Sequence, residues 1–174
     1  MDEELREIKI EPDEPLIPAE FGNSGGVKVG DWVVAVGNAL ALKGGPTVTM
    51  GIISAKGRTV RTERGDLYDM FQTDAAINPG NSGGALVNTA GELIGINTAI
   101  LSRTGGNIGI GFAIPSATAE PVIKQLLKSG EVRRGWLGGH IQTVTEELAE
   151  TLGLDRPRGA LVASVIEGGP AEQA

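Results

Sequence analysis

The chain is poor in the residues that support many kinds of protein chemistry. It has no cysteine, which excludes disulfide bonds and thiol catalysis but leaves the redox compartment open. It has one histidine, His140, and no cluster of residues at metal-ligand spacing, so we expect no metal and no other cofactor. Aromatic residues make up 3% of the chain, and no apolar run approaches the roughly 18 residues of a membrane span.

What remains is the composition of a globular protein. A chain of 174 residues can bury a core and hold one domain plus part of another. The 27 glycines indicate many tight turns, as in a small β-barrel. The net charge of −7 favours solubility and argues against nucleic acid as a partner. The first residues are acidic and polar, so we expect no signal peptide.

The feature that points to chemistry is a glycine-rich loop around Ser82, within residues 73–87. A serine hydroxyl reacts only when a base takes its proton and N–H groups meet the oxyanion that forms on the attacked carbonyl. Because glycine permits tight backbone turns, Gly80, Asn81 and Ser82 could direct two N–H groups toward one point. The alternative is an ordinary turn that contains a serine. The length of the surrounding string favours a nucleophile loop.

Two other interpretations of this pattern fail on their context. The five residues of Gly22–Gly26 repeat the same letters, but their flanks predict a polar turn before a strand, so we assign Ser24 no catalytic role. Residues 80–84 also fit the nucleophile elbow of α/β-hydrolases, which requires a helix after the serine. The two short apolar runs after Ser82 predict a β-hairpin instead.

Short apolar runs separated by turn signals predict a mainly β fold, with six strands in a compact antiparallel barrel. The runs cover residues 32–36, 47–53, 70–72, 85–88, 92–96 and 108–114. Residues Lys56 to Asp69 are polar and charged, which favours a long surface loop over a strand.

The last third of the chain has another pattern. Apolar residues at helical spacing over 117–127, followed by Gly130, predict a helix with a glycine stop signal. Beyond it, short elements are predicted: a strand near 140–141, a helix over 145–149, a strand over 159–165, and a turn or helix over 169–172. This last unit is too short to form a normal core by itself.

Several separate strings together resemble the HtrA (Deg/Do) family of trypsin-like serine proteases with PDZ domains, from about Phe21 to the last residue. They are residues 51–55, 72–86, 91–100, 106–115 and 134–138. The resemblance implies four parts: a lead-in segment (1–20), the C-terminal β-barrel of a chymotrypsin-like protease domain (21–114), a helix and linker (115–133), and the first half of a PDZ domain (134–174).

The resemblance also implies roles for individual residues. Ser82 would be the nucleophile, and N–H groups of Gly80 and Asn81, or of Gly80 and Ser82, would form the oxyanion hole. Ala76 would lie at the floor of the primary specificity pocket and favour cleavage after small aliphatic residues. The substrate backbone would pair with Ile96, Asn97 and Thr98, and a peptide carboxylate would bind at Trp136, Leu137, Gly138 and Gly139.

The general base is what the chain lacks. In chymotrypsin-type sequences the histidine precedes the serine, whereas His140 follows it and is expected to be an ordinary strand residue. Losing a triad member typically lowers turnover by about 10⁴–10⁶, so we expect this chain alone to be inactive. The alternative is a catalytically dead peptide-binding or assembly module. A Ser–Lys dyad with Lys43 or Lys56 gains no support from the spacing.

The family resemblance finally implies partners and a location. Substrates would be unfolded or misfolded polypeptides, and a complete PDZ domain would bind peptide C-termini. The full-length protein would be a homo-oligomer built on trimers. Its compartment would be the periplasm or cell envelope.

Overall fold

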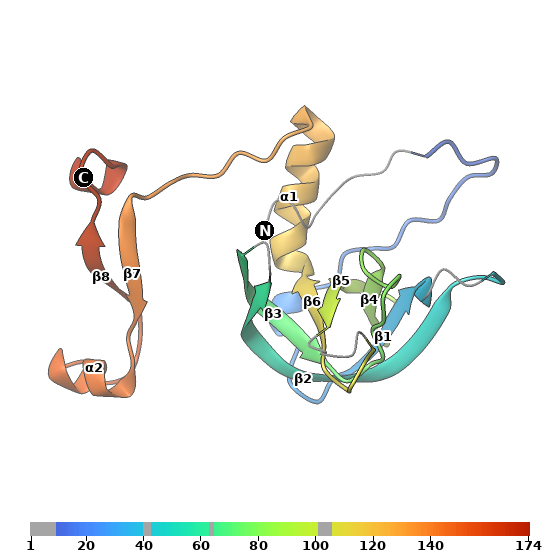
Figure 1. Cartoon of the computed structure of the whole chain (residues 1–174), viewed down its shortest axis with the longest axis horizontal. Helices are drawn as coiled ribbons and strands as arrows, with labels where there is room; N and C mark the ends of the chain where they lie inside the picture. The colour runs from blue at the N-terminus through green and yellow to red at the C-terminus, as the bar shows by residue number, and fades with distance from the viewer. Residues whose placement is uncertain (1–9, 40–42, 63–64, 101–105) are drawn as a thin grey trace. The chain divides into compact units, whose positions relative to one another are not determined.

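The computed structural model describes residues 10–39, 43–62, 65–100 and 106–174. The chain divides into two compact units, Met1–Val132 and Arg133–Ala174, and each is considered by itself (Figure 1). Among the described residues, no helix is long and apolar enough to cross a membrane.

The first unit is built from antiparallel strands. They are β1 (Trp32–Gly37), β2 (Thr47–Thr62), β3 (Gly65–Thr73), β4 (Ala85–Asn88), β5 (Leu93–Ile100) and β6 (Gly111–Pro115). Hydrogen-bonded neighbours follow the order β1-β2-β3-β6-β5-β4, and β4 pairs back with β1, so the ring of strands closes. The predicted mainly β architecture with six antiparallel strands is confirmed.

The prediction of a surface loop from Lys56 to Asp69 is wrong. β2 continues to Thr62 and β3 begins at Gly65, so most of this segment is a hairpin paired from Ile53 opposite Thr73 onward. The pairing shifts register three times, which spaces the inward side chains irregularly. Among the described residues of this segment, Val60 and Leu67 are the ones that are buried, and two apolar positions among charged ones carry too little pattern to indicate a strand.

The interior of the barrel follows from side chains that alternate along each strand. On β1, Val33 and Ala35 are fully buried, whereas Trp32 is 57% exposed on the outer face. In the described part of the barrel, this core contains the buried apolar residues Val27, Val33, Ala35, Ile53, Phe71, Ala75, Ile77, Leu86, Ile94 and Ala113.

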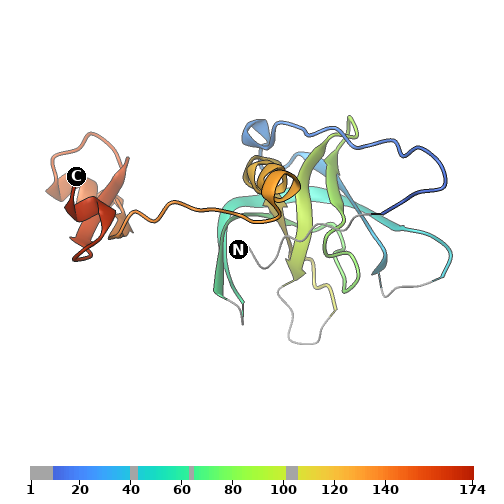
Figure 2. The same ribbon diagram turned by 90° about the horizontal axis from the view of Figure 1, so that it is seen from above.

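Helix α1 (Ser116–Ser129) covers a second apolar cluster. Ala119 of the helix packs there with Val60, Leu67, Met70, Phe112 and Ile114. Gly130 closes the helix with a left-handed φ of 71°, and its N–H donates to the carbonyl of Leu126, as the predicted glycine stop requires. Figures 1 and 2 show α1 rising from the part of the barrel that contains β5 and β6.

The repeated Gly-Asn-Ser-Gly-Gly string before β1 contributes to the fold. Ser24 opens the short helix η1 (Ser24–Gly26), is 3% exposed, and its Oγ accepts the N–H of Ala117 at 3.0 Å. Ser116 Oγ donates to the carbonyl of Gly22 at 2.8 Å. This string therefore anchors the first turn of α1, which agrees with the exclusion of Ser24 from catalysis.

The second unit contains β7 (Gly139–Thr143), α2 (Glu146–Thr151), β8 (Ala160–Val165) and η3 (Pro170–Glu172), as its sequence pattern predicts. The two strands pair antiparallel, and Thr145 caps α2 by accepting the N–H of Leu148 at 3.3 Å. Few of its apolar side chains are buried, Val144 and Ala149 among them.

Candidate active site

The loop around Ser82 consists of two consecutive tight turns. The N–H of Asn81 donates to the carbonyl of Asn78 at 2.9 Å, and the N–H of Gly84 donates to that of Asn81 at 3.0 Å. The third position of each turn is a glycine with positive φ, 98° at Gly80 and 84° at Gly83. Type II turns require this conformation at that position. The glycines of the motif are thus explained by the backbone path that presents Ser82.

Backbone and side-chain hydrogen bonds tie this loop to β5 and β1. The N–H of Gly83 donates to the carbonyl of Asn97 at 2.7 Å, and the N–H of Asn97 donates to that of Gly84 at 2.9 Å. The side chain of Asn97 is fully buried, and its Nδ2 donates to the carbonyls of Val36 (3.2 Å) and Ala85 (3.0 Å). Asn97 therefore bridges three segments of the barrel directly under the serine loop.

The hydroxyl of Ser82 is exposed, and its Oγ donates to the carbonyl of Thr98 at 3.0 Å. The amides of Gly80 and Ser82 donate no hydrogen bond to any described residue. The amide of Asn81 is used within the first turn, whereas the amides of Gly80 and Ser82 have no hydrogen-bond acceptor among the described residues. Which two amides form the oxyanion hole stays a prediction.

None of the candidate bases contacts the hydroxyl among the described residues. His140 is exposed on β7, in the second unit. Lys56 Nζ donates to the carbonyl of Val27 at 2.5 Å and lies 5.8 Å from the centre of the Phe71 ring, so it is engaged elsewhere. No group of three or more possible metal ligands is present in the described part of the chain.

Ala76, the predicted floor of the specificity pocket, is half-buried and held through its carbonyl. Thr49 Oγ1 donates to this oxygen at 2.9 Å and Asn81 Nδ2 at 3.4 Å. The Oδ1 atom of Asn81 is buried and accepts no hydrogen bond from the described residues. The backbone around Ala76 is thereby fixed from two sides.

Sequence reasoning missed Asn107, which links a distant loop to the serine loop. Its N–H donates to Asn78 Oδ1 at 2.9 Å, and its Nδ2 donates to the carbonyl of Ile77 at 3.1 Å. Its own Oδ1 accepts the N–H of Gly109 at 2.7 Å. A lone asparagine in a glycine-rich loop gives no spacing signal, so only the folded structure shows this connection.

The predicted substrate strand is already paired within the fold at two of its three residues. Ile96 lies opposite Ala85 on one side and Ile114 on the other, so β4 and β6 already flank it. Asn97 is enclosed in the same way by the serine loop and by β6. Thr98 lies past the end of the β4 pairing, next to Ser82. Pairing of a substrate backbone with this strand stays a prediction.

In the second unit, Gly138 has a positive φ of 76° and is buried against Gly169 and Pro170. The carbonyls of Leu137 and Gly138 accept the N–H groups of Ala171 (2.9 Å) and Ile166 (2.8 Å). The hydrogen bonds within the described residues include none donated by the amides of Leu137 and Gly138.

The sequence of this site and its surroundings matches a known protein family. Residues 5–96, more than half of the chain, match the trypsin-like peptidase domain, and this stretch contains the serine loop. The chain belongs to the trypsin-like peptidase family. Its similarity to HtrA proteases, predicted from the sequence strings, is also confirmed.

Two curated relatives are similar to nearly the whole of this trypsin-like chain. A "Probable periplasmic serine endoprotease DegP-like" of Rickettsia conorii is 54% identical over 172 residues, 98% of this chain and 34% of the relative. The protein of the same name from Chlamydia pneumoniae is 52% identical over 171 residues, with 98% and 34% covered. The similarity thus extends into the segment before Phe21. The chain spans about a third of the length of these curated relatives.

Solved structures of an HtrA-type protease are also similar to this chain. The HtrA-type protease AlgW with decapeptide matches with a TM-score of 0.67 and 52% identity over 89% of this chain and 47% of that chain. AlgW with tripeptide matches with a TM-score of 0.72 and 52% identity, over 89% of this chain and 50% of that chain.

Proposed function

We propose that the chain is the nucleophile-bearing part of an HtrA-type serine endopeptidase, which cleaves unfolded polypeptides through an acyl-enzyme on Ser82. One observation carries the proposal: an exposed serine hydroxyl stands on a double turn whose Gly80 and Ser82 amides are open to a ligand. The DegP-like relatives and AlgW support the same activity.

In this mechanism Ser82 Oγ gives its proton to a base and attacks the scissile carbonyl, and the N–H groups of Gly80 and Ser82 stabilise the oxyanion. The substrate C–N bond then breaks, the amine leaves with the proton returned by the base, and water later releases the acyl group from Ser82. Ala76 supplies no charge for lysine or arginine, and the similarity to HtrA proteases implies cleavage after small aliphatic residues. The substrate backbone lies along β5 beside Thr98. Turns already formed before the reaction need no reorganisation as charge develops.

The chain alone is expected to be inactive because nothing described in its first unit can take the proton of Ser82. A histidine from another part of the full-length protein would supply this step. The alternative function, a catalytically dead peptide-binding or assembly module, is favoured by the hydrogen bond that Ser82 Oγ donates to Thr98, since that proton faces a carbonyl and no base.

Fluorophosphonate labelling with added imidazole distinguishes the two functions. We expect no labelling of the chain alone, slow labelling when imidazole serves as the base, and none in Ser82→Ala. Mass spectrometry should place the label on Ser82 and not on Ser24, which has the same neighbours. Imidazole that restores no labelling in a folded chain would favour the inert module.

The second unit is proposed as the first half of a PDZ domain, in which the amides of Leu137 and Gly138 receive a peptide carboxylate together with Trp136 and Gly139. Open amides in the loop before β7 support this assignment. Further proposals are a homo-oligomer built on trimers and a periplasmic or cell-envelope location, the latter supported by the names of the relatives.

A further inference from the structure

A hollow of about 570 Å³ lies on the first unit and shares no residue with the serine loop. It is bounded by the η1 segment, the start of β1 and the turn between β4 and β5. Small-molecule and side-chain sites commonly have volumes of about 300–1,000 Å³. This feature, named here the Trp32 hollow, is not used by the proposed catalytic mechanism.

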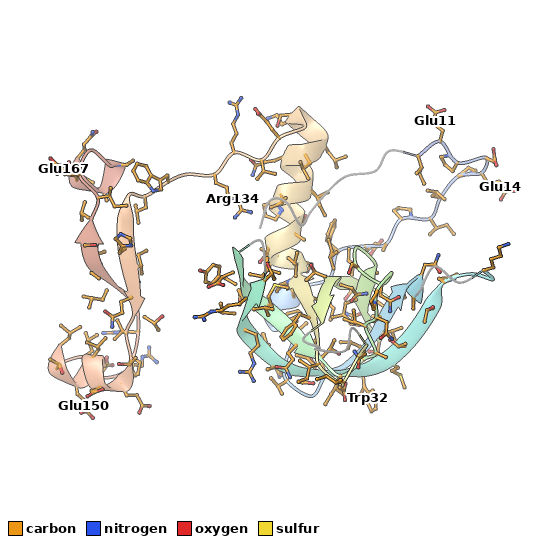
Figure 3. All side chains as sticks on the ribbon, in the orientation of Figure 1. Glu11, Glu14, Trp32, Arg134, Glu150 and Glu167 are labelled. Carbon is orange, nitrogen blue, oxygen red and sulfur yellow. The ribbon has the colours of Figure 1, made fainter. Side chains whose placement is uncertain are left out.

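Among the described residues, three side chains form the apolar lining of the Trp32 hollow. Val27 (8% exposed) and Ile94 (1% exposed) belong to the barrel core and also line the hollow. Trp32 is 57% exposed, because β1 directs it to the outer face, and Figure 3 labels its side chain at the edge of the barrel. An exposed indole beside two core residues provides an apolar surface for an alkyl chain.

The polar lining carries negative charge. Asp31 and Glu92 both line the hollow, and each uses one carboxylate oxygen within the fold. Asp31 Oδ2 accepts the N–H of Lys28 at 2.8 Å, and Glu92 Oε2 accepts Asn88 Nδ2 at 2.7 Å. The second oxygen of each carboxylate has no hydrogen bond or ion pair with the described residues.

Basic groups do not neutralise this site in the described part of the chain. The lining there includes no lysine or arginine. Lys56 touches one lining residue, but its Nζ is engaged with the carbonyl of Val27 and sits over the Phe71 ring. The net charge of −7 adds to the negative potential at the hollow.

We propose that the Trp32 hollow binds the long cationic side chain of an arginine or lysine in a bound polypeptide. Such side chains combine an apolar stem with a charged head. The stem matches Val27, Ile94 and the indole face, and the head matches the free oxygens of Asp31 and Glu92 and the Trp32 π-system. A bare cation would leave the apolar lining unused, and a neutral apolar group would desolvate two carboxylates without compensation. The hollow thus gives a polypeptide a second point of attachment, independent of chemistry at Ser82.

Tryptophan fluorescence tests this proposal directly, because the chain has two tryptophans and Trp136→Phe leaves Trp32 as the reporter. The probes are two acetylated and amidated pentapeptides, one with arginine between glycines and the other with citrulline, its neutral isostere. The amide end prevents binding through a peptide carboxylate. We expect the arginine peptide to shift the emission of Trp32 at millimolar concentration. The citrulline peptide should bind at least about fivefold more weakly.

A matched pair of double variants locates the binding. Asp31→Asn with Glu92→Gln should weaken the arginine peptide about fivefold or more, while Asp13→Asn with Glu14→Gln changes the net charge equally and should have no effect. Equal binding of the two peptides overturns the proposal, as does equal loss in both double variants. If the first double variant unfolds, the proposal is tested by the affinities of the arginine and citrulline peptides for the Trp136→Phe protein. A response to calcium but to neither peptide also overturns it.

Discussion

Gly84→Ala tests whether the serine loop is pressed as closely onto β1 as the structure shows. A β-carbon at this position would lie far inside contact distance of the Val36 carbonyl, 2.9 Å from the carbonyl oxygen of Asn81 and 3.1 Å from the Cα of Gly37. All three neighbours are backbone atoms, which cannot rotate away as a side chain would. The loop and β1 must therefore separate.

The cost can be worked from this geometry. Overpacking of a well-packed site costs about 1–3 kcal/mol, and separation also stretches the hydrogen bond from Asn97 Nδ2 to the Val36 carbonyl, worth about 1 kcal/mol. We expect a loss of about 3 kcal/mol in the free energy of unfolding of the first unit. At an m-value of about 1.5–2 kcal/mol/M this lowers the urea midpoint by about 1.5–2 M.

Urea unfolding followed by Trp32 fluorescence, in the Trp136→Phe background, measures this change in the first unit. The control is Gly106→Ala, where a β-carbon meets nothing within 4 Å and φ is not in the left-handed region. It should shift the midpoint little. A loss below about 1 kcal/mol for Gly84→Ala, or an equal loss in the control, would refute the close approach of the loop to β1.

Three further changes probe the same region. Asn97→Leu should destabilise the first unit by about 2–4 kcal/mol in urea, because the buried Asn97 side chain no longer donates to the half-buried carbonyls of Val36 and Ala85; a neutral result would contradict the bridge. Asn107→Ala should speed amide hydrogen exchange at Gly109 and in the serine loop about tenfold, with global stability lowered by about 1 kcal/mol; unchanged exchange would exclude the link. Ser82→Ala should change the unfolding free energy by less than about 0.5 kcal/mol, since the side chain is exposed, and a larger effect would give the hydroxyl a structural role.

The sequence indicates the fold well where apolar and turn residues alternate regularly. β1, the hairpin after Ser82 and the glycine stop at Gly130 all follow from local pattern. The β2–β3 hairpin does not, because three register shifts break its alternation and its charged residues face outward. A strand with several bulges lacks regular alternation of inward and outward side chains, so its pairing with neighbouring strands identifies it and its own sequence does not.

The candidate site also follows only partly from the sequence. Ser82 and its glycines could be predicted because each turn requires a specific residue type at a fixed position. The sequence does not show which amides of the loop are already used in hydrogen bonds. It therefore left open whether the amide of Asn81 or that of Ser82 would join the amide of Gly80 as an oxyanion donor. Asn97 and Asn107 were equally hidden as structural bridges, since their partners lie far away in the chain.

The order of strands in the closed ring has a consequence for how the chain folds. β6 is the last strand of the ring in sequence, yet it lies between β3 and β5, and β1 must also pair with β4. During synthesis both β3 and β5 therefore keep an unpaired edge until the ribosome has released Pro115. Such non-local pairing predicts folding on the millisecond-to-second scale, and open edges at that stage favour pairing between nascent chains. A chain cut just before Gly111 should consequently aggregate, although it would retain Ser82 and every residue of its loop.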